Sequence, residues 1–210
     1  MAGRSTIIAL AGGVGGGRLA YGLVRAVPDD TLTIVVNTAD DFEHMGLYVS
    51  PDLDSVMYAV AGQDNLETGW GVAGETWAFM DALARLGGET WFKLGDRDLA
   101  THVLRTHRLR NGVRLSDVTA SLLAGFGISH RIVPMTDDVV RTEVMTDESK
   151  LAFQEYFVRR QSEPRVRGFE FVGAAAAVPS PPVAAAFSDP DLAAIVFCPS
   201  NPFVSIAPIL

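Results

Sequence analysis

The sequence predicts an α/β fold of the Rossmann-like, three-layer kind, in which a parallel sheet has helices on both faces and carries a small mixed insertion. Short apolar runs typical of buried strands alternate with helical patterns along much of the chain. A glycine-rich turn joins the first expected strand to the first expected helix. The chain has 210 residues, 48% of them hydrophobic, which is enough for one substantial core. We therefore expect a single domain over residues 1–210, with a helical and β insertion at about residues 95–165.

Strands and helices alternate in the first half of the chain. The apolar run Thr6 to Leu10 predicts a strand, and leucines at helical spacing after the glycine turn predict a helix. Ser50-Pro51 is typical of a helix start, with a capping serine before proline at the first helical position. The other elements expected in this half are a strand at Leu32 to Val36, a helix from about Thr76 to Leu86, and a short strand at Trp91 to Leu94.

The second half is first helical and then rich in strands. Asp96 is expected to cap a helix that reaches about Leu109, and Ser116 a second helix that ends near Gly125. β-branched and aromatic residues predict the remaining strands, at Val139 to Met145, Leu151 to Val158, Phe169 to Val172 and Ala194 to Phe197. The first two of these strands are expected to form an antiparallel insertion.

Composition excludes several classes of protein. The single cysteine, Cys198, allows no disulfide framework and no multi-cysteine zinc site, and we expect it in the core. No apolar run is long enough for a membrane helix, and the first residues do not resemble a signal peptide, so we expect a cytoplasmic protein. A net charge of -8 argues against a nucleic-acid partner, which requires a basic surface.

The charges are separated along the chain. Residues 26–84 contain eleven acids and no lysine or arginine, whereas residues 93–131 contain seven basic residues against three acids. An acidic block and a basic block in one small chain suit a site that handles a metal ion and a phosphorylated ligand together. The alternative is that both blocks are solvated faces.

The glycine-rich turn reads Gly12-Gly13-Val14-Gly15-Gly16-Gly17-Arg18. Because glycine has no Cβ, backbone N–H groups and a helix N-terminus can approach a phosphate closely there. The turn lacks the third glycine of the dinucleotide-binding fingerprint, and it lacks the lysine of a P-loop. It indicates a phosphate site, with a flexible turn that holds no ligand as the alternative.

Polar side chains follow the second expected strand and begin the next helix. Asn37, Asp40 and Asp41 come directly after the strand, and Asp52 and Asp54 come a short loop later. The carboxyl ends of parallel strands line the ligand crevice, and Mg²⁺ binds carboxylate oxygens together with substrate phosphates. This pattern predicts a magnesium site. The helix dipole gives an alternative reason for an acid at Asp52.

Two further segments carry polar groups. The run Gly95 to Asp98, with His102 downstream, offers anion-binding and acid/base groups or, alternatively, an ordinary capped helix. Asn201 is held between two prolines, which suits an amide that reads a base or a sugar, or simply a stiff turn. The arginine-rich helix pair around Asn111-Gly112 lacks base-reading side chains at the start of its second helix, so DNA binding is not expected.

Several of these segments, taken together and in order, resemble the 2-phospho-L-lactate transferase family of coenzyme F420 biosynthesis. The resemblance extends from about residue 6 to the end of the chain, and its most specific part is the block Gly95 to His102. The segments that carry it are Gly12 to Gly16, Asn37 to Asp41, Pro51 to Asp54, Gly69 to Gly71 with Glu75 to Trp77, Trp91 to His102, and Pro199 to Pro202.

The resemblance implies a Mg²⁺-dependent transfer reaction in a homodimer. A guanosine diphosphate-linked three-carbon acid (phospholactyl, enolpyruvyl or phosphoglyceryl) donates its phosphate-linked group to the deazaflavin Fo, and GMP is released. We expect Asp40 and Asp54 to be catalytic and to bind the metal, and Trp77 or Trp91 to pack near the deazaflavin ring. The residues expected to bind the donor are Gly12, Gly13, Gly15, Gly16, Asn37, Arg97, Ser200 and Asn201.

Two other kinds of protein remain open. A Rossmann-type nucleotide-sugar or dinucleotide enzyme would bind NAD(P) in place of GDP. A nucleotide-binding protein without this transferase activity would bind GDP or Fo without turnover. Family members usually continue beyond the position of Leu210, so we expect this chain to lack the family's C-terminal part.

Overall fold

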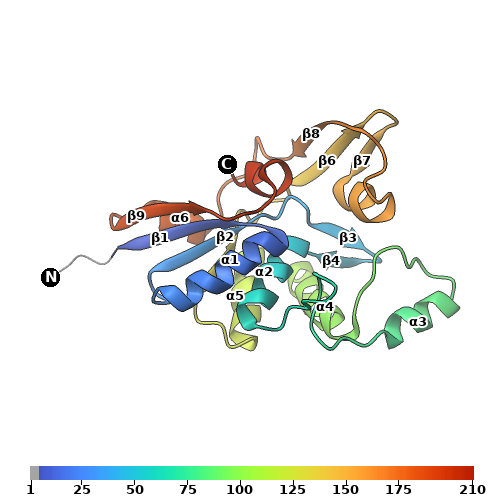
Figure 1. Cartoon of the computed structure of the whole chain (residues 1–210), viewed down its shortest axis with the longest axis horizontal. Helices are drawn as coiled ribbons and strands as arrows, with labels where there is room; N and C mark the ends of the chain where they lie inside the picture. The colour runs from blue at the N-terminus through green and yellow to red at the C-terminus, as the bar shows by residue number, and fades with distance from the viewer. Residues whose placement is uncertain (1–4) are drawn as a thin grey trace.

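The computed structural model describes residues 5–210 and shows helices packed around a parallel sheet (Figure 1). The four strands have the order β5-β2-β1-β9, and every neighbouring pair is parallel. Their bounds are β1 (Thr6–Ala11), β2 (Leu32–Val36), β5 (Arg131–Pro134) and β9 (Leu192–Phe197). All five residues of β2 are buried, as expected for an inner strand of a sheet covered on both faces. The predicted fold class is confirmed.

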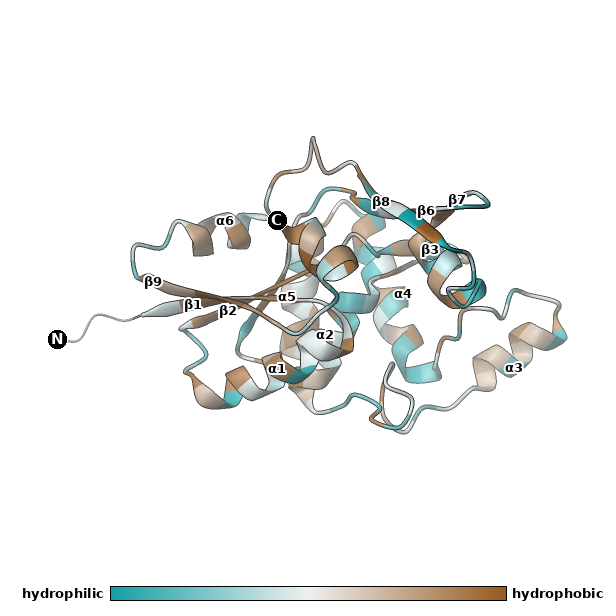
Figure 2. Ribbon diagram, turned by 45° about the horizontal axis from the view of Figure 1, so that its top comes forward, coloured by the Kyte–Doolittle hydropathy of each residue, from teal (hydrophilic) through white to brown (hydrophobic). Residues whose placement is uncertain are grey.

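Helices cover both faces of this sheet (Figure 2). On one face, Ala9 and Ile34 pack with apolar residues of α1 (Gly13–Ala26), α2 (Pro51–Ala61) and α5 (Leu115–Gly125). On the other face, Ile8 and Val35 pack against α6 (Pro181–Phe187) and the C-terminal turn η2 (Pro202–Ile206), which is followed by η3 (Ala207–Ile209). This alternation of neighbouring strand residues between two cores is the period-2 pattern of a sheet.

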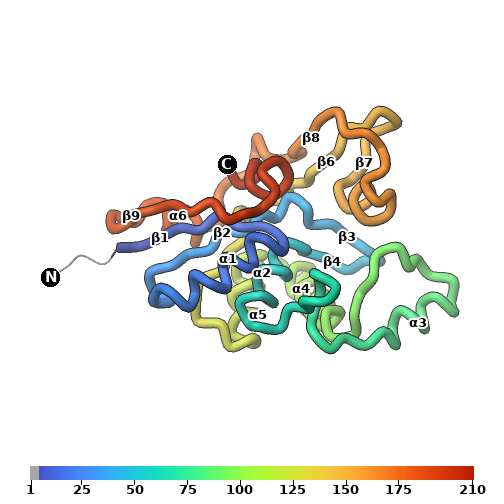
Figure 3. The backbone as a smooth tube through the Cα atoms, in the orientation of Figure 1, coloured from blue at the N-terminus to red at the C-terminus, as the bar shows by residue number. Residues whose placement is uncertain are grey.

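The remaining elements lie around the carboxyl ends of the strands. A small antiparallel sheet of order β7-β6-β8 stands apart from the main sheet, and the segment that carries α3 loops outward from the body of the molecule (Figure 3). The bounds are β3 (Phe42–His44), β4 (Leu47–Val49), α3 (Ala78–Arg85), α4 (Asp96–Arg110), β6 (Arg141–Thr146), β7 (Lys150–Ala152), η1 (Glu155–Arg159) and β8 (Val166–Val172). The residues expected to form one insertion lie in two places: α5 packs on the main sheet, whereas β6 to β8 form a separate sheet.

Two strand predictions need correction. Residues 91–94 form no strand, because Trp91 and Phe92 pack into a ring cluster with Phe42 and His44. The strand expected at Leu151 to Val158 ends at Ala152, and the chain turns into η1. Strands β3, β4 and β5 were not predicted.

Two capping predictions were also wrong. Asp96 is the first residue of α4, and its carboxylate instead accepts hydrogen bonds from the backbone N–H groups of Ala78 and Phe79 at the start of α3. Ser116 lies inside α5, where its hydroxyl and its backbone N–H both donate to Asp137. Within residues 5–210, no helix has both the length and the apolar character needed to cross a bilayer.

Candidate active site

A cleft of about 880 Å³ lies where the carboxyl end of the main sheet meets the small sheet. One side of the cleft comes from the starts of α1 and α2, and the other comes from η1 and β8. Residues lining it include Gly13, Asp40, Asp52 and Ser205 at the main sheet, Phe153, Gln154, Tyr156, Phe157 and Phe169 at the small sheet, and Trp70, Trp91, Phe92 and Lys93 between them. The position of this cleft agrees with the rule for parallel sheets, in which ligands bind outside the carboxyl ends of the strands.

Two carboxylates at this cleft share one amide. Asn37 follows directly after β2, and its Nδ2 lies 3.3 Å from Oδ1 of Asp40 and 2.9 Å from Oδ2 of Asp52. Both acids are almost fully buried. Within residues 5–210, neither carboxylate forms an ion pair with a lysine or arginine. We call Asp40 and Asp52 the acid pair.

Burial and repulsion raise the pKa values of the acid pair. The pKa of Asp40 is raised well above its usual value, first by burial and then by the charges of Asp52 and Asp41. Burial raises the pKa of Asp52 to about 6, although hydrogen bonds from Asn37, Ser205 and the Gly13 backbone oppose the shift. Two carboxylates in this state need either a proton or a cation. The pair therefore has the electrostatics of a site for a hard cation.

Asp52 also lies against the glycine-rich turn at the start of α1. A Cβ on Gly12 would collide with Oδ2 of Asp52, and a Cβ on Gly15 would collide with the backbone oxygen of Pro199. The expected donor-binding glycines Gly13 and Gly16 line the same turn. The glycines are thus required by close approach of Asp52 and of the loop after β9, and their predicted contact with a diphosphate stays a prediction.

The loop after β9 reaches this turn from the other end of the chain. The hydroxyl of Ser200 donates to the backbone oxygen of Gly12 at 2.8 Å and accepts from its N–H at 3.0 Å. Oδ1 of Asn201 accepts hydrogen bonds from the N–H groups of Phe203 and Val204 and so caps η2. Ser200 and Asn201, both expected to bind the donor, therefore also stabilise the fold, and Asn201 in addition lines the cleft.

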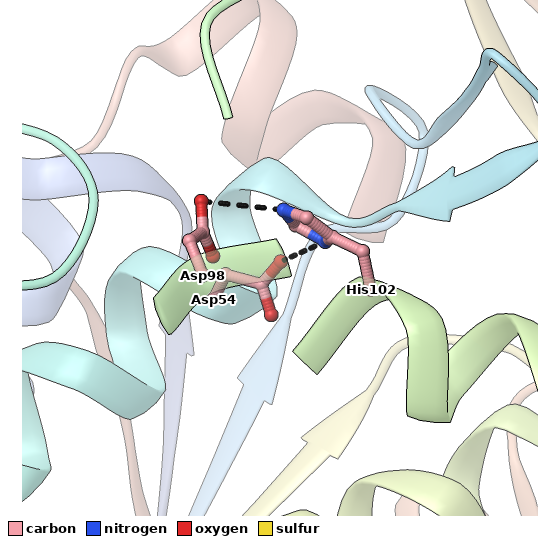
Figure 4. A group of neighbouring side chains, drawn as sticks. All are labelled: Asp54, Asp98 and His102. Carbon is pink, nitrogen blue, oxygen red and sulfur yellow. Dashed lines mark ion pairs between the residues drawn. The ribbon is translucent and has the colours of Figure 1, made fainter. Parts of the chain in front are cut away.

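Asp54 lies in a different environment from the acid pair. Its carboxylate accepts a two-pronged interaction from Arg105, a side chain that is completely buried. Nδ1 of His102 lies 3.6 Å from Asp54, and Nε2 of the same ring lies 3.2 Å from Asp98 (Figure 4). The Tyr58 hydroxyl donates to Asp98 at 2.6 Å. We call these five residues the buried network.

The buried network contains a possible metal-binding group. Ligand atoms of Asp54, Asp98 and His102 all lie within 4.8 Å of one another, so this group could bind a metal. The guanidinium of Arg105 already neutralises Asp54, however, and burial that would raise the pKa of Asp98 is outweighed by His102 and Tyr58, which lower it. A cation fits the acid pair better, because nothing in the described chain neutralises it.

Several predicted and unpredicted residues can now be placed. Arg97 is exposed beside Gly74 and donates to the backbone oxygen of Ala73, and it is not among the residues that line the cleft. Trp91 lines the cleft, whereas Trp77 packs edge-on against Trp70. No local sequence pattern indicated two cleft residues that contact the acid pair, Gln154 and Ser205, because both belong to segments far from Asp40 and Asp52 in the chain.

The fold and the cleft together define a class of protein: an α/β protein with an acid-lined ligand cleft at the carboxyl end of a parallel sheet. The chain matches the family described as 2-phospho-L-lactate transferase CofD over residues 7–210. It belongs to this family, as the sequence resemblance indicated.

Curated relatives carry two related names. A phosphoenolpyruvate transferase of Streptomyces griseus is 46% identical over 97% of this chain and 65% of its own length. A 2-phospho-L-lactate transferase of Methanosarcina mazei is 40% identical over 97% of this chain and 67% of its own length. The chain thus spans about two thirds of the relatives that it matches.

A solved structure is similar in fold. A member of the UPF0052 family from Bacillus halodurans aligns with a TM-score of 0.64 over 100% of this chain and 63% of its own, at 12% identity. At this identity the likeness concerns the fold alone.

Proposed function

We propose that this chain catalyses transfer of a phosphate-linked three-carbon acid from a guanosine diphosphate-linked donor to the deazaflavin Fo, as a step of coenzyme F420 biosynthesis. The ribityl hydroxyl oxygen of Fo forms a bond to the phosphorus that carries the acid. The bond between that phosphorus and the GMP oxygen breaks, GMP leaves, and the hydroxyl proton is released. Family membership and the names of the curated relatives support a transfer of this kind.

The acid pair is the observation that carries the proposal. Phosphoryl transfer requires neutralisation of charge and in-line positioning more than covalent catalysis. Asp40 and Asp52 present uncompensated carboxylates at the floor of the cleft, next to the start of α1. Bound Mg²⁺ would neutralise the negative oxygens of the donor, and Asp40 and Asp52 are the residues that would hold it.

Asp54 takes another role in this proposal. The sequence assigns Asp54 to the metal together with Asp40, but its pairing with Arg105 leaves it without the excess charge that attracts a cation. We therefore assign Asp54 to holding α2 against α4. Its role as a metal ligand stays a prediction.

The cleft also suits an acceptor with a flat ring. Its lining is mainly apolar and includes Trp91, Phe92, Phe153 and Phe157. Phe153 and Phe157 are themselves stacked, with ring centroids 5.6 Å apart. Aromatic side chains of this kind give a planar ring system a large contact area at low entropic cost.

Mass spectrometry tests the proposal directly. The protein is incubated with Fo, Mg²⁺ and each of three guanylylated acids, carrying phospholactate, phosphoenolpyruvate or phosphoglycerate. We expect a Fo adduct and GMP with one of these donors, and no product when EDTA removes the metal. Absence of product with every donor, from a folded protein, would overturn the proposal.

A nucleotide-binding protein without turnover, the alternative left open by the sequence, is the second candidate. Saturable quenching of Fo fluorescence together with absence of product would identify it. The predicted homodimer and the predicted cytoplasmic location stay predictions, to be checked by light scattering and by fractionation.

A further inference from the structure

Gln154 is a buried amide in a wall of the cleft that is mainly aromatic. It lies between β7 and η1, with Phe153 and Tyr156 close to it along the chain. Only 5% of the residue is exposed. Burial of an amide costs free energy unless its N–H groups are bonded, so the partner of this side chain is informative.

That partner is Asp40. Nε2 of Gln154 lies 3.4 Å from Oδ2 of Asp40 and 3.4 Å from its backbone oxygen. The other carboxylate oxygen of Asp40 faces Nδ2 of Asn37. The carboxylate is therefore held between two amides, one from the main sheet and one from the small-sheet side of the cleft.

Asn37 alone does not saturate the carboxylate. Its Nδ2 carries two hydrogens but faces three acceptors, which are Asp40, Asp52 and the backbone oxygen of Val204. Because Asp40 and Asp52 repel each other, a second hydrogen-bond donor to Asp40 stabilises its ionised carboxylate. Gln154 is that donor.

A backbone hydrogen bond also joins the small sheet to the segment that carries Asp40. The N–H of Thr142, in β6, donates to the backbone oxygen of Ala39 at 2.6 Å. The small sheet is thus attached at the residue immediately before Asp40. A movement of the aromatic wall would be transmitted to the carboxylate through both contacts.

We propose that Gln154 is a positioning residue, whose amide orients the Asp40 carboxylate for metal binding and links the aromatic wall to the acid pair. The inference rests on the proposed function, since it takes Asp40 to be a residue that holds the metal. It adds a residue from the inserted sheet to the machinery of the transfer.

The substitution Gln154→Met tests the amide at nearly constant side-chain length. Because a hydrogen bond to a charged group is lost, we expect kcat to fall about 10-fold or more, with KM for donor and acceptor within about 2-fold of wild type. Calorimetry with Mn²⁺ alone should show weaker binding. The matched control is Gln63→Met, at an exposed residue of the loop after α2. This substitution should change neither kcat nor the affinity for Mn²⁺.

The isosteric substitution Gln154→Glu separates positioning from packing. It keeps the shape of the side chain but places a carboxylate against Asp40, so a positioning role predicts a larger loss of kcat than Gln154→Met causes. A packing role predicts the reverse order, or a rise in KM for the acceptor alone. Thermal unfolding identifies any variant that fails to fold.

The outcomes separate the role of Gln154 from the proposed function. If wild type turns over and neither kcat nor Mn²⁺ affinity depends on residue 154, the inference is wrong and the proposed function stands. If wild type neither binds Mn²⁺ nor turns over, the proposed function fails and the inference fails with it. A fall in kcat and in Mn²⁺ affinity without a change in KM supports both.

Discussion

Asp52 and Asp54 lie two residues apart in α2, yet the fold gives their carboxylates opposite surroundings. Residues two apart point to nearly opposite sides of an α-helix, because each residue turns the helix by about 100°. Asp54 therefore meets Arg105 of α4, whereas Asp52 meets Asp40 and the start of α1. The charge of Asp54 is neutralised within the protein, whereas the charge of Asp52 needs a proton or a cation. A dense acidic segment thus contains both a structural ion pair and a candidate metal site.

The largest effect on stability is expected from breaking the buried network. Arg105→Met leaves Asp54 as a buried charge without its partner, which should lower the free energy of unfolding by about 3–5 kcal/mol. For a chain of this size that corresponds to a fall in Tm on the order of 10 °C, measurable by circular dichroism. The double variant Arg105→Met/Asp54→Asn should recover part of the loss.

An exposed ion pair provides the control. Arg114 pairs with Asp117 at the surface, so Arg114→Met should cost less than about 1 kcal/mol. Equal losses for Arg105→Met and Arg114→Met would show that burial of the Arg105 pair has no energetic consequence.

The acid pair should respond in the opposite way. Asp40→Asn and Asp52→Asn each remove one of two repelling carboxylates, so the metal-free protein should be as stable as wild type or more so. The rate of transfer should fall about 100-fold or more, the size expected when a charged group that serves the transition state is removed. Steady-state assays at saturating substrate, with the exposed acid variant Asp81→Asn as control, give the comparison. Near wild-type rates in both variants would refute the proposed site.

Stability of the metal-free protein should depend on pH with a definite sign. The pKa of Asp52 is raised to about 6, that of Asp41 is raised to about 7 by burial, and that of Asp40 is raised well above its usual value. The folded state therefore binds more protons than the unfolded state above about pH 4, and stability falls as pH rises toward 8. Asp98 has the opposite sign, but its contribution is lost only at lower pH. Burial lowers the pKa of His44, so this one side chain opposes the trend at about pH 6, against the three raised carboxyl groups.

Thermal unfolding in EDTA should accordingly give a higher Tm at pH 5 than at pH 8, by several degrees, because each pKa unit corresponds to about 1.4 kcal/mol. Addition of Mg²⁺ at pH 8 should raise Tm again, since the cation replaces the missing protons. A Tm that rises from pH 5 to pH 8 without metal would contradict the assignment of the acid pair.

Local sequence patterns predicted individual strands and one helix start correctly. Alternating apolar runs located β1, β2 and β9, and Ser50-Pro51 marked the start of α2. Asp96 and Ser116 were wrongly predicted to cap their own helices, because each forms a hydrogen bond with a distant segment instead. The sequence alone does not distinguish a polar residue that caps its own helix from one that bonds elsewhere.

In the candidate site, too, only the residues next to a recognisable strand end could be placed from the sequence. Asp40 and Asn37 follow a strand whose end is recognisable, so their place at the cleft could be inferred. The pairing of Asp54 with Arg105 joins residues 51 positions apart, and the contact of Gln154 with Asp40 spans 114. Such contacts depend on how α4 and the small sheet pack, which no local pattern specifies.

Substitution of Arg97, at the surface, should have only a small effect on nucleotide binding. The sequence places it among the donor-binding residues, but its guanidinium is exposed and bonded to the backbone of Ala73, away from the residues that line the cleft. An exposed contact of this kind is worth about 0–1 kcal/mol, so Arg97→Ala should change GDP affinity by less than about 5-fold. Lys93 lines the cleft, where its ammonium group is available to a bound phosphate, so we expect Lys93→Ala to weaken the affinity more than Arg97→Ala does. Titration calorimetry with GDP measures both variants. A 10-fold or larger loss for Arg97→Ala would contradict this expectation and would support the predicted role of Arg97 in donor binding.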